Sequence, residues 1–291
     1  MVKNKILVIA GMHRSGTSLT TQWLQKCGLH IGDELLGADT GNDNGHFEDM
    51  DFLNSHKALL KSRRLSDNGF TADPLKPLTC EEKDRLKDII NYKNGFNQEW
   101  GWKDPRTCLF LDAYKELIPG AFYFVVLRDY QSVISSLVYR MYKQRETKYA
   151  SKKGLAAFVW RHFGRKGKME KLRKKYCQRY LQLWIAYNEA ILRHLKNTPE
   201  VNYLVADYSV LFKNDRIVFE HLVNEWGFTL QYFNFMNIYK DGQISKSFDI
   251  SPYIKDKSLL SKAMRISEAL QQKSVLQHPP ASVAALQGAL L

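Results

Sequence analysis

Short apolar runs alternate along the chain with longer segments in which apolar residues recur every three or four positions. The runs are short enough to be buried strands, and they lie at 6–10, 100–103, 122–127 and 201–206. The segments with helical periodicity lie at 17–27, 50–65, 131–142, 176–195 and 212–226. This alternation predicts an α/β fold of three layers, with a central parallel sheet flanked by helices.

Capping patterns predict where two further helices begin. Thr79 and Glu82 have the spacing of a capping box, which predicts a helix from there towards Tyr92. Asp104 followed by Pro105 has the pattern of an N-cap and a first helical position, and we expect that helix to run to about Ile118.

The 291 residues suit a single domain, which we expect to span residues 1–276, with an irregular tail at 277–291. The net charge is +13, and residues 140–175 hold fourteen Lys or Arg against two Glu. We expect this segment to form a basic helical lobe. A run of this kind is often only a solvated face, but it also suits an anionic acceptor, an anionic membrane surface or nucleic acid.

No apolar run is long enough to cross a membrane, and the apolar part of the N-terminus is too short for a signal peptide. Four cysteines without a CxxC pair indicate reduced thiols. Together these features predict a cytoplasmic protein.

Residues 11–18, with the sequence GMHRSGTS, stand between a predicted strand and a predicted helix. Such a turn points backbone N–H groups and the positive end of a helix at one spot, which binds phosphate or sulfate. The spacing is that of the Walker A loop GxxxxGK[ST], except that Thr17 replaces the lysine and Arg14 supplies a cation inside the loop.

The RSGTS sequence resembles the 5′-phosphosulfate loop of sulfotransferases that use 3′-phosphoadenosine 5′-phosphosulfate (PAPS). The likeness is to their bacterial, Golgi-type and tyrosylprotein branches, and it implies a P-loop-like fold. It assigns the sulfuryl donor to five loop residues: Arg14, Ser15, Gly16, Thr17 and Ser18.

A second segment resembles the site that holds the nucleotide 3′-phosphate in the same family. Arg128 follows the predicted strand 122–127, and Ser136 lies eight residues further on. By this resemblance the two residues bind the 3′-phosphate. Tyr208 resembles a family tyrosine near the adenine, although the acidic residues that usually follow are absent, so a plain core tyrosine is an equal prediction.

Residues 45–49, with the sequence GHFED, resemble a family segment in which a Glu acts as base. The resemblance makes Glu48 the catalytic base, with His46 as second candidate and Asp49 and His56 after it. It also assigns His46 and Asp49 to binding the acceptor. From the sequence alone, Glu48 could instead cap a helix that begins near Met50.

Residues 100–107 resemble the family's WKDPR segment. Lys103 and Arg14 are assigned to neutralising charge in the transition state, and Arg106 to the acceptor or the donor. We expect Asp104 to cap a helix or hold Lys103 rather than act as base, and the tryptophans beside Lys103 to lie in the core.

The resemblance therefore predicts an O-sulfotransferase that uses PAPS, releases 3′-phosphoadenosine 5′-phosphate (PAP) and needs no metal. A glycan, a glycolipid or a secondary metabolite is the expected acceptor. The alternatives are a P-loop kinase, an inactive scaffold with this fold, and a nucleic-acid binder using the basic segment. The kinase needs the lysine that Thr17 replaces, and no nucleic-acid motif accompanies the basic residues.

Overall fold

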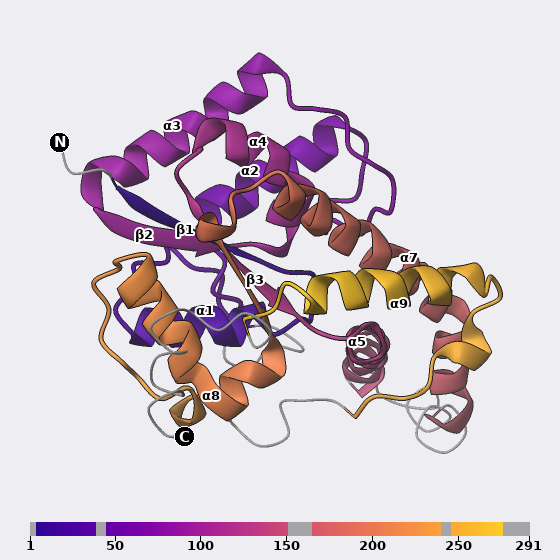
Figure 1. Cartoon of the computed structure of the whole chain (residues 1–291). Coiled ribbons are helices and arrows are strands. Elements are labelled where there is room, and N and C mark those ends of the chain that lie inside the picture. The colour runs from indigo at the N-terminus through magenta and orange to yellow at the C-terminus, as the bar shows by residue number, and fades with distance from the viewer. Residues whose placement is uncertain (1–3, 39–44, 151–164, 240–245, 276–291) are drawn as a thin grey trace.

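The structure of the chain is a computed structural model that describes residues 4–38, 45–150, 165–239 and 246–275. At its centre lies a four-stranded, all-parallel sheet in the order β2-β1-β3-β4 (Figure 1). The strands are β1 (Lys5–Ala10), β2 (Glu99–Lys103), β3 (Phe122–Leu127) and β4 (Tyr203–Asp207). The predicted strands and the predicted parallel sheet are confirmed.

Helices cover both faces of the sheet. One face carries α1 (Thr17–Lys26) and α8 (Tyr208–Glu220). On the other side lie α2 (Met50–Ser62), α3 (Cys80–Phe96), α4 (Leu111–Leu117), α5 (Tyr130–Ala150), α7 (Arg165–Lys196) and α9 (Ser258–Gln271). Shorter turns occur at Pro105–Leu109, Glu200–Asn202, His221–Glu225, Phe235–Asn237 and Ser251–Tyr253. The three-layer prediction is confirmed.

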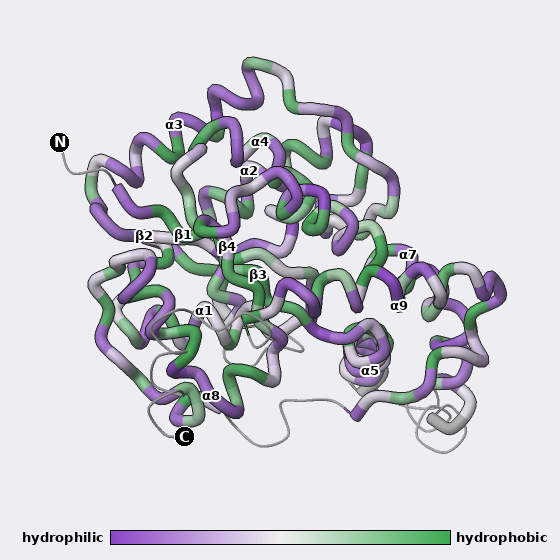
Figure 2. The backbone as a smooth tube through the Cα atoms, in the orientation of Figure 1, coloured by the Kyte–Doolittle hydropathy of each residue, from purple (hydrophilic) through white to green (hydrophobic). Residues whose placement is uncertain are grey.

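Each central strand divides its side chains between two cores. Val8 faces the core beneath α5 and α7, whereas Leu7 and Ile9 face the core beneath α1 and α8. Apolar residues accordingly gather along the sheet and the inner sides of the helices (Figure 2). This alternation, with period two, is why buried strands on both faces appear in the sequence as continuous apolar runs.

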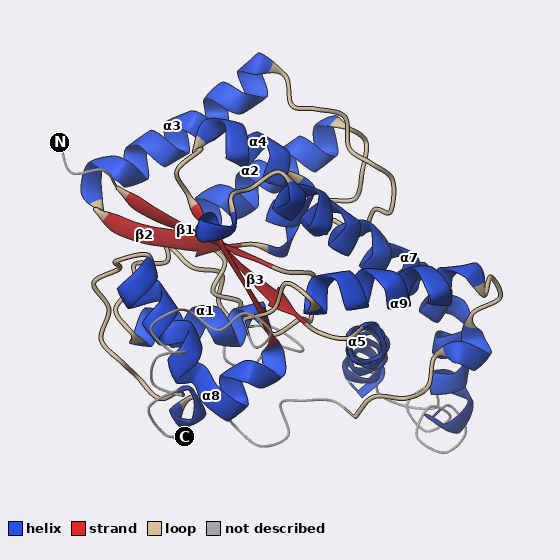
Figure 3. Cartoon of the chain, in the orientation of Figure 1, coloured by secondary structure: helices blue, strands red, loops and turns tan. Residues whose placement is uncertain are grey.

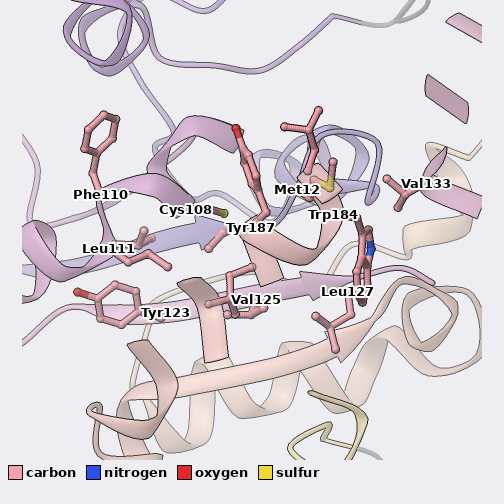
Figure 4. Packing of buried hydrophobic residues seen from close by; sticks show 14 of the residues in the cluster. Met12, Cys108, Phe110, Leu111, Tyr123, Val125, Leu127, Val133, Trp184 and Tyr187 are labelled. Atoms are coloured by element: carbon pink, nitrogen blue, oxygen red, sulfur yellow. The ribbon is translucent and has the colours of Figure 1, made fainter. Parts of the chain in front are cut away.

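The core beside α7 extends up to the edge where the strands end. Figure 4 shows Val125 and Leu127 of β3 packed close to Tyr187 and Trp184 of α7, with Met12 just beyond β1. The first residues after β1 and β3 therefore emerge from a closely packed region, which fixes the positions of the loops that follow.

The capping box is confirmed: Glu82 N donates to Thr79 Oγ1 at 3.3 Å, and Thr79 N donates to Glu82 Oε2 at 2.9 Å. The single helix predicted from Asp104 to Ile118 is wrong. A 3₁₀ turn occupies Pro105–Leu109, and α4 begins only at Leu111 (Figure 3). Phe110, with φ −125° and ψ 14°, is not helical and separates the two.

Several boundaries also differ from the prediction. α5 continues past the predicted Tyr142 to Ala150, α7 begins at Arg165 instead of Tyr176, and β4 begins at Tyr203 instead of Val201. α8 begins four residues before the predicted Phe212 and closes with the π turn at 221–225. α9 was not predicted, and it packs on α7 and β4.

The described residues of the predicted basic lobe lie on the C-terminal part of α5 and the N-terminal part of α7, which pack against each other. Residues 151–164 of that lobe and the predicted tail at 277–291 lie outside the described residues. All four cysteines are free thiols. Across the described ranges, no helix has both the length and the apolar character that a membrane span requires.

Arg63 and Glu82 join the ends of α2 and α3, with Nη1 and Nη2 at 2.7 and 2.6 Å from the two carboxylate oxygens. The hydrogen bonds from Arg63 lower the pKa of Glu82 to about 2. The pair therefore adds stability that is complete above about pH 4.3, the pKa of an unfolded Glu, and is lost as the pH falls towards 2.

We expect Glu82→Gln to lower the free energy of unfolding at pH 7 by about 1 kcal/mol. The difference from the wild type should shrink between pH 4 and pH 2, because the wild-type carboxylate is then protonated as well. Urea unfolding across this range measures it, and a difference that stays constant with pH would contradict this assignment.

Candidate functional site

The predicted site segments follow the carboxyl ends of the four strands, except for residues 45–49, which precede α2. The loop of residues 11–18 follows β1, Asp104 and Arg106 follow β2, Arg128 follows β3, and Tyr208 follows β4. Because the strands are parallel, their carboxyl ends meet at one edge of the sheet, which is where open α/β folds bind ligands.

The loop of residues 11–18 is shaped by close packing. Gly16 has φ +97°, and a Cβ there would lie 2.2 Å from the ring of Tyr208, so only glycine fits. Arg14 also has a positive φ of 71°. Gly16 is the N-cap of α1, whose first turn contains no acidic residue, so the positive end of this helix points into the loop.

The two predicted anion-binding segments touch each other. Arg14 Nε donates to Ser136 Oγ at 2.9 Å, and Arg128 Nη1 donates to the backbone oxygen of Arg14 at 3.0 Å. Asp129 caps α5, on which Ser136 lies, by accepting from Ser132 N at 2.8 Å. The loop after β1 and the start of α5 are therefore joined by hydrogen bonds from two arginine side chains.

Arg128 carries a charge that is largely buried, and burial lowers its pKa. In the described part of the chain it makes no ion pair with a carboxylate, and its guanidinium carbon lies 6.0 Å from the centre of the Tyr208 ring. A partly buried cation without a carboxylate partner is an expected position for an anionic ligand.

Tyr208 is 8% exposed and packs beneath Gly16. It thus supports the loop from below, and its role near an adenine stays a prediction.

Lys103 connects the loop to Glu48. Its Nζ lies 3.0 Å from Glu48 Oε1 and 3.3 Å from Ser18 Oγ, and it also donates to the backbone oxygen of His46. Burial lowers the pKa of Lys103, and the charge of Glu48 opposes this shift. The predicted base and the predicted cation are thus in direct contact.

His46 lies beside the pair of Lys103 and Glu48, and its Nδ1 is 3.9 Å from Glu48 Oε1.

Arg106 contacts the same carboxylate from the other side. Its Nη1 lies 3.6 Å from Glu48 Oε2 and 2.8 Å from Asp104 Oδ1. Asp104 also caps the turn after β2 by accepting from Arg106 N at 3.0 Å, and it accepts from His56 Nδ1 at 2.7 Å. Burial alone would raise the pKa of Asp104, but the hydrogen bond and charge of His56 and the charge of Arg106 hold it well below its usual range.

Asp49, whose role at the acceptor stays a prediction, has contacts that hold its own segment in place. It caps α2 by accepting from Asp51 N at 2.9 Å, and its Oδ2 lies 2.8 Å from the Nζ of Lys93, which is 1% exposed. Lys93 also pairs with Asp33 and Asp51, each at 2.8 Å. Asp49 rather than Glu48 is thus the capping acid, which leaves the Glu48 carboxylate to face Lys103.

Two further histidines lie near the site: His56, which was only a weak candidate for the base, and His13, which had no predicted role. His56 is fully buried between Asp104 and Tyr114, and its partners are too distant in the sequence for any local pattern to indicate them. His13 lies in the loop itself, between Phe70 and Tyr187. Its position within the loop motif is the only sequence signal that could have singled it out.

No protein-family model matches the chain, and no curated protein matches it either. Among solved structures, the sulfotransferase domain from the curacin biosynthetic pathway is 14% identical, with a TM-score of 0.48 over 93% of this chain and 99% of that one. The sulfotransferase domain from the Synechococcus PCC 7002 olefin synthase is 16% identical, with a TM-score of 0.48 over 92% and 96%. Sulfotransferase STF1 from Mycobacterium tuberculosis H37Rv is 12% identical, with a TM-score of 0.42 over 90% and 77%.

All three are sulfotransferases, the family that the sequence motifs resemble. Because identities and TM-scores this low do not establish a shared activity, the activity has to be inferred from the residues of the site.

Asp104→Ala leaves His56 and Arg106 in the interior without their shared carboxylate. We expect it to lower the free energy of unfolding by about 3 kcal/mol or more, the cost of breaking a buried pair. Asp112→Ala is the control, because Asp112 is 61% exposed and pairs with Arg193 on the surface, so its loss should cost less than about 1 kcal/mol. Equal urea-unfolding midpoints for the two variants would contradict a structural role for Asp104.

Proposed function

We propose that this chain is a sulfotransferase that moves a sulfuryl group from PAPS to an acceptor hydroxyl. The observation that carries the proposal is the contact between the two anion-binding segments, through Arg14 with Ser136 and Arg128 with the Arg14 backbone. One nucleotide with a phosphosulfate at one end and a 3′-phosphate on its ribose needs two anion sites side by side. In this proposal the neighbouring ends of β1 and β3 supply both.

The chain's own residues fit this donor. The loop of residues 11–18 and the N-terminus of α1 would hold the 5′-phosphosulfate, and Arg128 with Ser136 would hold the 3′-phosphate. Ser136 is 2% exposed, and Arg14 donates to its hydroxyl. In this proposal Arg14, which was also expected to neutralise charge in the transition state, would contact the 3′-phosphate side, and Lys103 would be the cation beside Glu48.

Sulfuryl transfer breaks the bond between sulfur and the bridging oxygen of the donor and forms a bond from sulfur to the acceptor oxygen. PAP leaves, and the acceptor's proton goes to a base. In this proposal Glu48 takes that proton. Lys103 neutralises negative charge on the transferred group, because its Nζ contacts both Glu48 and Ser18 of the loop.

A P-loop kinase is the second candidate, and the contacts at the strand ends favour it less. Such an enzyme uses a lysine where this chain has Thr17, and a carboxylate at a strand end for Mg²⁺. The acids that stand at the ends of β2 and β4 are engaged in capping. Asp104 accepts from Arg106 N at 3.0 Å, and Asp207 accepts from Ser209 N at 2.8 Å.

We expect the wild-type protein to release PAP from labelled PAPS in the presence of a mixture of hydroxylated acceptors, and Glu48→Gln to reduce this turnover by about 10²–10⁴-fold. Calorimetry should show that Glu48→Gln still binds PAP, because Glu48 acts on the acceptor. His46→Gln is the matched control, since it changes the neighbouring candidate base.

Full turnover in Glu48→Gln with loss in His46→Gln would move the role of base to His46. Phosphoryl transfer from ATP with Mg²⁺, without any turnover of PAPS, would refute the sulfotransferase proposal.

A further inference from the structure

The carboxylate of Asp104 lies between the proposed reaction centre and the buried interior. On one side its Oδ1 accepts from Arg106 Nη1 at 2.8 Å, and the same Nη1 lies 3.6 Å from Glu48 Oε2. On the other side its Oδ2 accepts from His56 Nδ1 at 2.7 Å. Asp104 therefore links His56, which lies on α2, to the side chain that contacts the proposed base.

The other hydrogen bonds of Asp104 do not fix the plane of its carboxylate. The bonds from the backbone N and the Nη1 of Arg106 both go to Oδ1, at 3.0 and 2.8 Å. The last torsion of an Asp side chain has a broad range, so a carboxylate held at one oxygen can turn. The bond from His56 engages the second oxygen, and a carboxylate held at both oxygens keeps one orientation.

The His56 ring is fixed by its own packing. It is fully buried and stacks on the Phe110 ring, with centroids 5.2 Å apart and ring planes 10° apart. Its Nε2 lies 2.7 Å from Tyr114 Oη of α4. Among the described residues, this nitrogen is the only hydrogen-bond partner of the Tyr114 hydroxyl.

These contacts determine which nitrogen of the neutral His56 ring carries the proton. The pKa of Asp104 lies well below its usual range, so its carboxylate is ionised and only accepts hydrogen bonds. Burial raises the pKa of Tyr114 well above its usual value, so the hydroxyl keeps its proton. Tyr114 therefore donates to Nε2, and Nδ1 carries the proton that is donated to Asp104.

The orientation of Asp104 matters because it supplies one of two side-chain anchors of Arg106. Arg106 Nε donates to Asp67 O at 2.7 Å, and its Nη1 donates to Asp104 Oδ1. Two anchors hold the plane of a guanidinium, whereas one anchor lets it rotate. Loss of the Asp104 anchor would move Nη1 relative to Glu48 Oε2, and a displacement of about 1 Å can cost about a hundredfold in rate.

We propose that His56 is a positioning residue of the proposed reaction centre. It holds the Asp104 carboxylate in one orientation, Asp104 holds the guanidinium of Arg106, and Arg106 keeps the Glu48 carboxylate in place for the proton of the acceptor hydroxyl. In this proposal His56 acts through Asp104 and contacts no substrate. The inference rests on the sulfotransferase function proposed above and adds to its site a residue outside the motifs at 11–18, 45–49, 100–107 and 122–136.

Two polar substitutions separate the two sides of the His56 ring. His56→Asn places an amide nitrogen where Nδ1 lies, so it keeps a donor to Asp104 and loses the contact with Tyr114. His56→Gln places its amide one bond further out, so it can reach Tyr114 and loses the donor to Asp104.

The measurement is PAP release from labelled PAPS in a mixture of hydroxylated acceptors. We expect His56→Gln to lower kcat by about 10–100-fold, because Arg106 and Glu48 are displaced. The KM for PAPS and the affinity for PAP should be unchanged, because His56 lies away from the proposed donor site. His56→Asn should retain most of the wild-type kcat.

Leu59→Ala is the control for a general loss of stability. Leu59 is buried on α2, one turn beyond His56, and its side chain packs in the same core. We expect Leu59→Ala to lower the urea-unfolding midpoint, because it leaves a cavity, and to leave kcat unchanged.

Equal kcat values for His56→Gln and His56→Asn would overturn the inference, and so would a loss of kcat in Leu59→Ala as large as that in His56→Gln. Should His56→Gln not fold, His56→Asn decides. Retention of kcat in this variant supports the inference, and a loss of about tenfold or more overturns it, because the donor to Asp104 is still present.

The wild type separates this inference from the proposed function. If it releases PAP from PAPS and the two variants do not differ, this inference alone fails. If it neither binds PAP nor releases it, the proposed function fails as well. If it binds PAP without turnover in the mixture, crystal structures of the variants decide: Arg106 should keep its contact with Asp104 in His56→Asn and lose it in His56→Gln, and an unchanged contact in both overturns the inference.

Discussion

The hydrogen bond from Arg14 Nε to Ser136 Oγ joins two loops whose residues are 122 positions apart in the chain. It is possible because β1 and β3 are parallel neighbours, paired from Leu7 with Phe122 to Ala10 with Val125. Their carboxyl ends therefore emerge together, and the segments that follow must share one surface. A different strand order would separate the two proposed anion sites, and the single nucleotide that the proposed function requires could not reach both.

Beside this contact, the proposed reaction centre contains two fully buried charged residues, Lys103 and Asp104, that are adjacent in the chain. Lys103 extends towards Glu48 and the loop of residues 11–18, and Asp104 extends towards His56 and Arg106. Charges in the interior are costly unless they are paired, and here each has partners from other segments. The same pairs hold Lys103 and Glu48 in place before any ligand arrives. This is the kind of preorganisation that lowers the barrier of a reaction in which charge moves.

Local sequence patterns were sufficient to predict the strands, the capping box at Thr79 and the loop at 11–18, because each is determined by residues close together in the sequence. They did not predict the break at Phe110. There the backbone leaves helical geometry between the 3₁₀ turn at Pro105–Leu109 and α4, and both of these pack on the core. They were also insufficient for α9, whose position depends on packing against α7 and β4.

The same limit applies to the site. Arg14, Lys103 and Arg128 could be singled out because each stands in a motif at a strand end. The pairing of Asp49 with Lys93 and of Asp104 with His56 depends on contacts between distant segments, which no spacing reveals. The family resemblance assigned Asp49 to the acceptor, and no local pattern indicated its contact with Lys93, which joins the start of α2 to α3.

The most direct test of the central claim, that one nucleotide occupies the neighbouring ends of β1 and β3, is to measure by calorimetry the binding of PAP, adenosine 5′-phosphate and adenosine 3′-phosphate. If the claim is right, PAP binds at least about tenfold more tightly than either monophosphate, since each phosphate has charge-assisted hydrogen bonds of its own. Arg128→Ala should then remove most of the advantage over adenosine 5′-phosphate. Binding of either monophosphate as tight as that of PAP would contradict the claim.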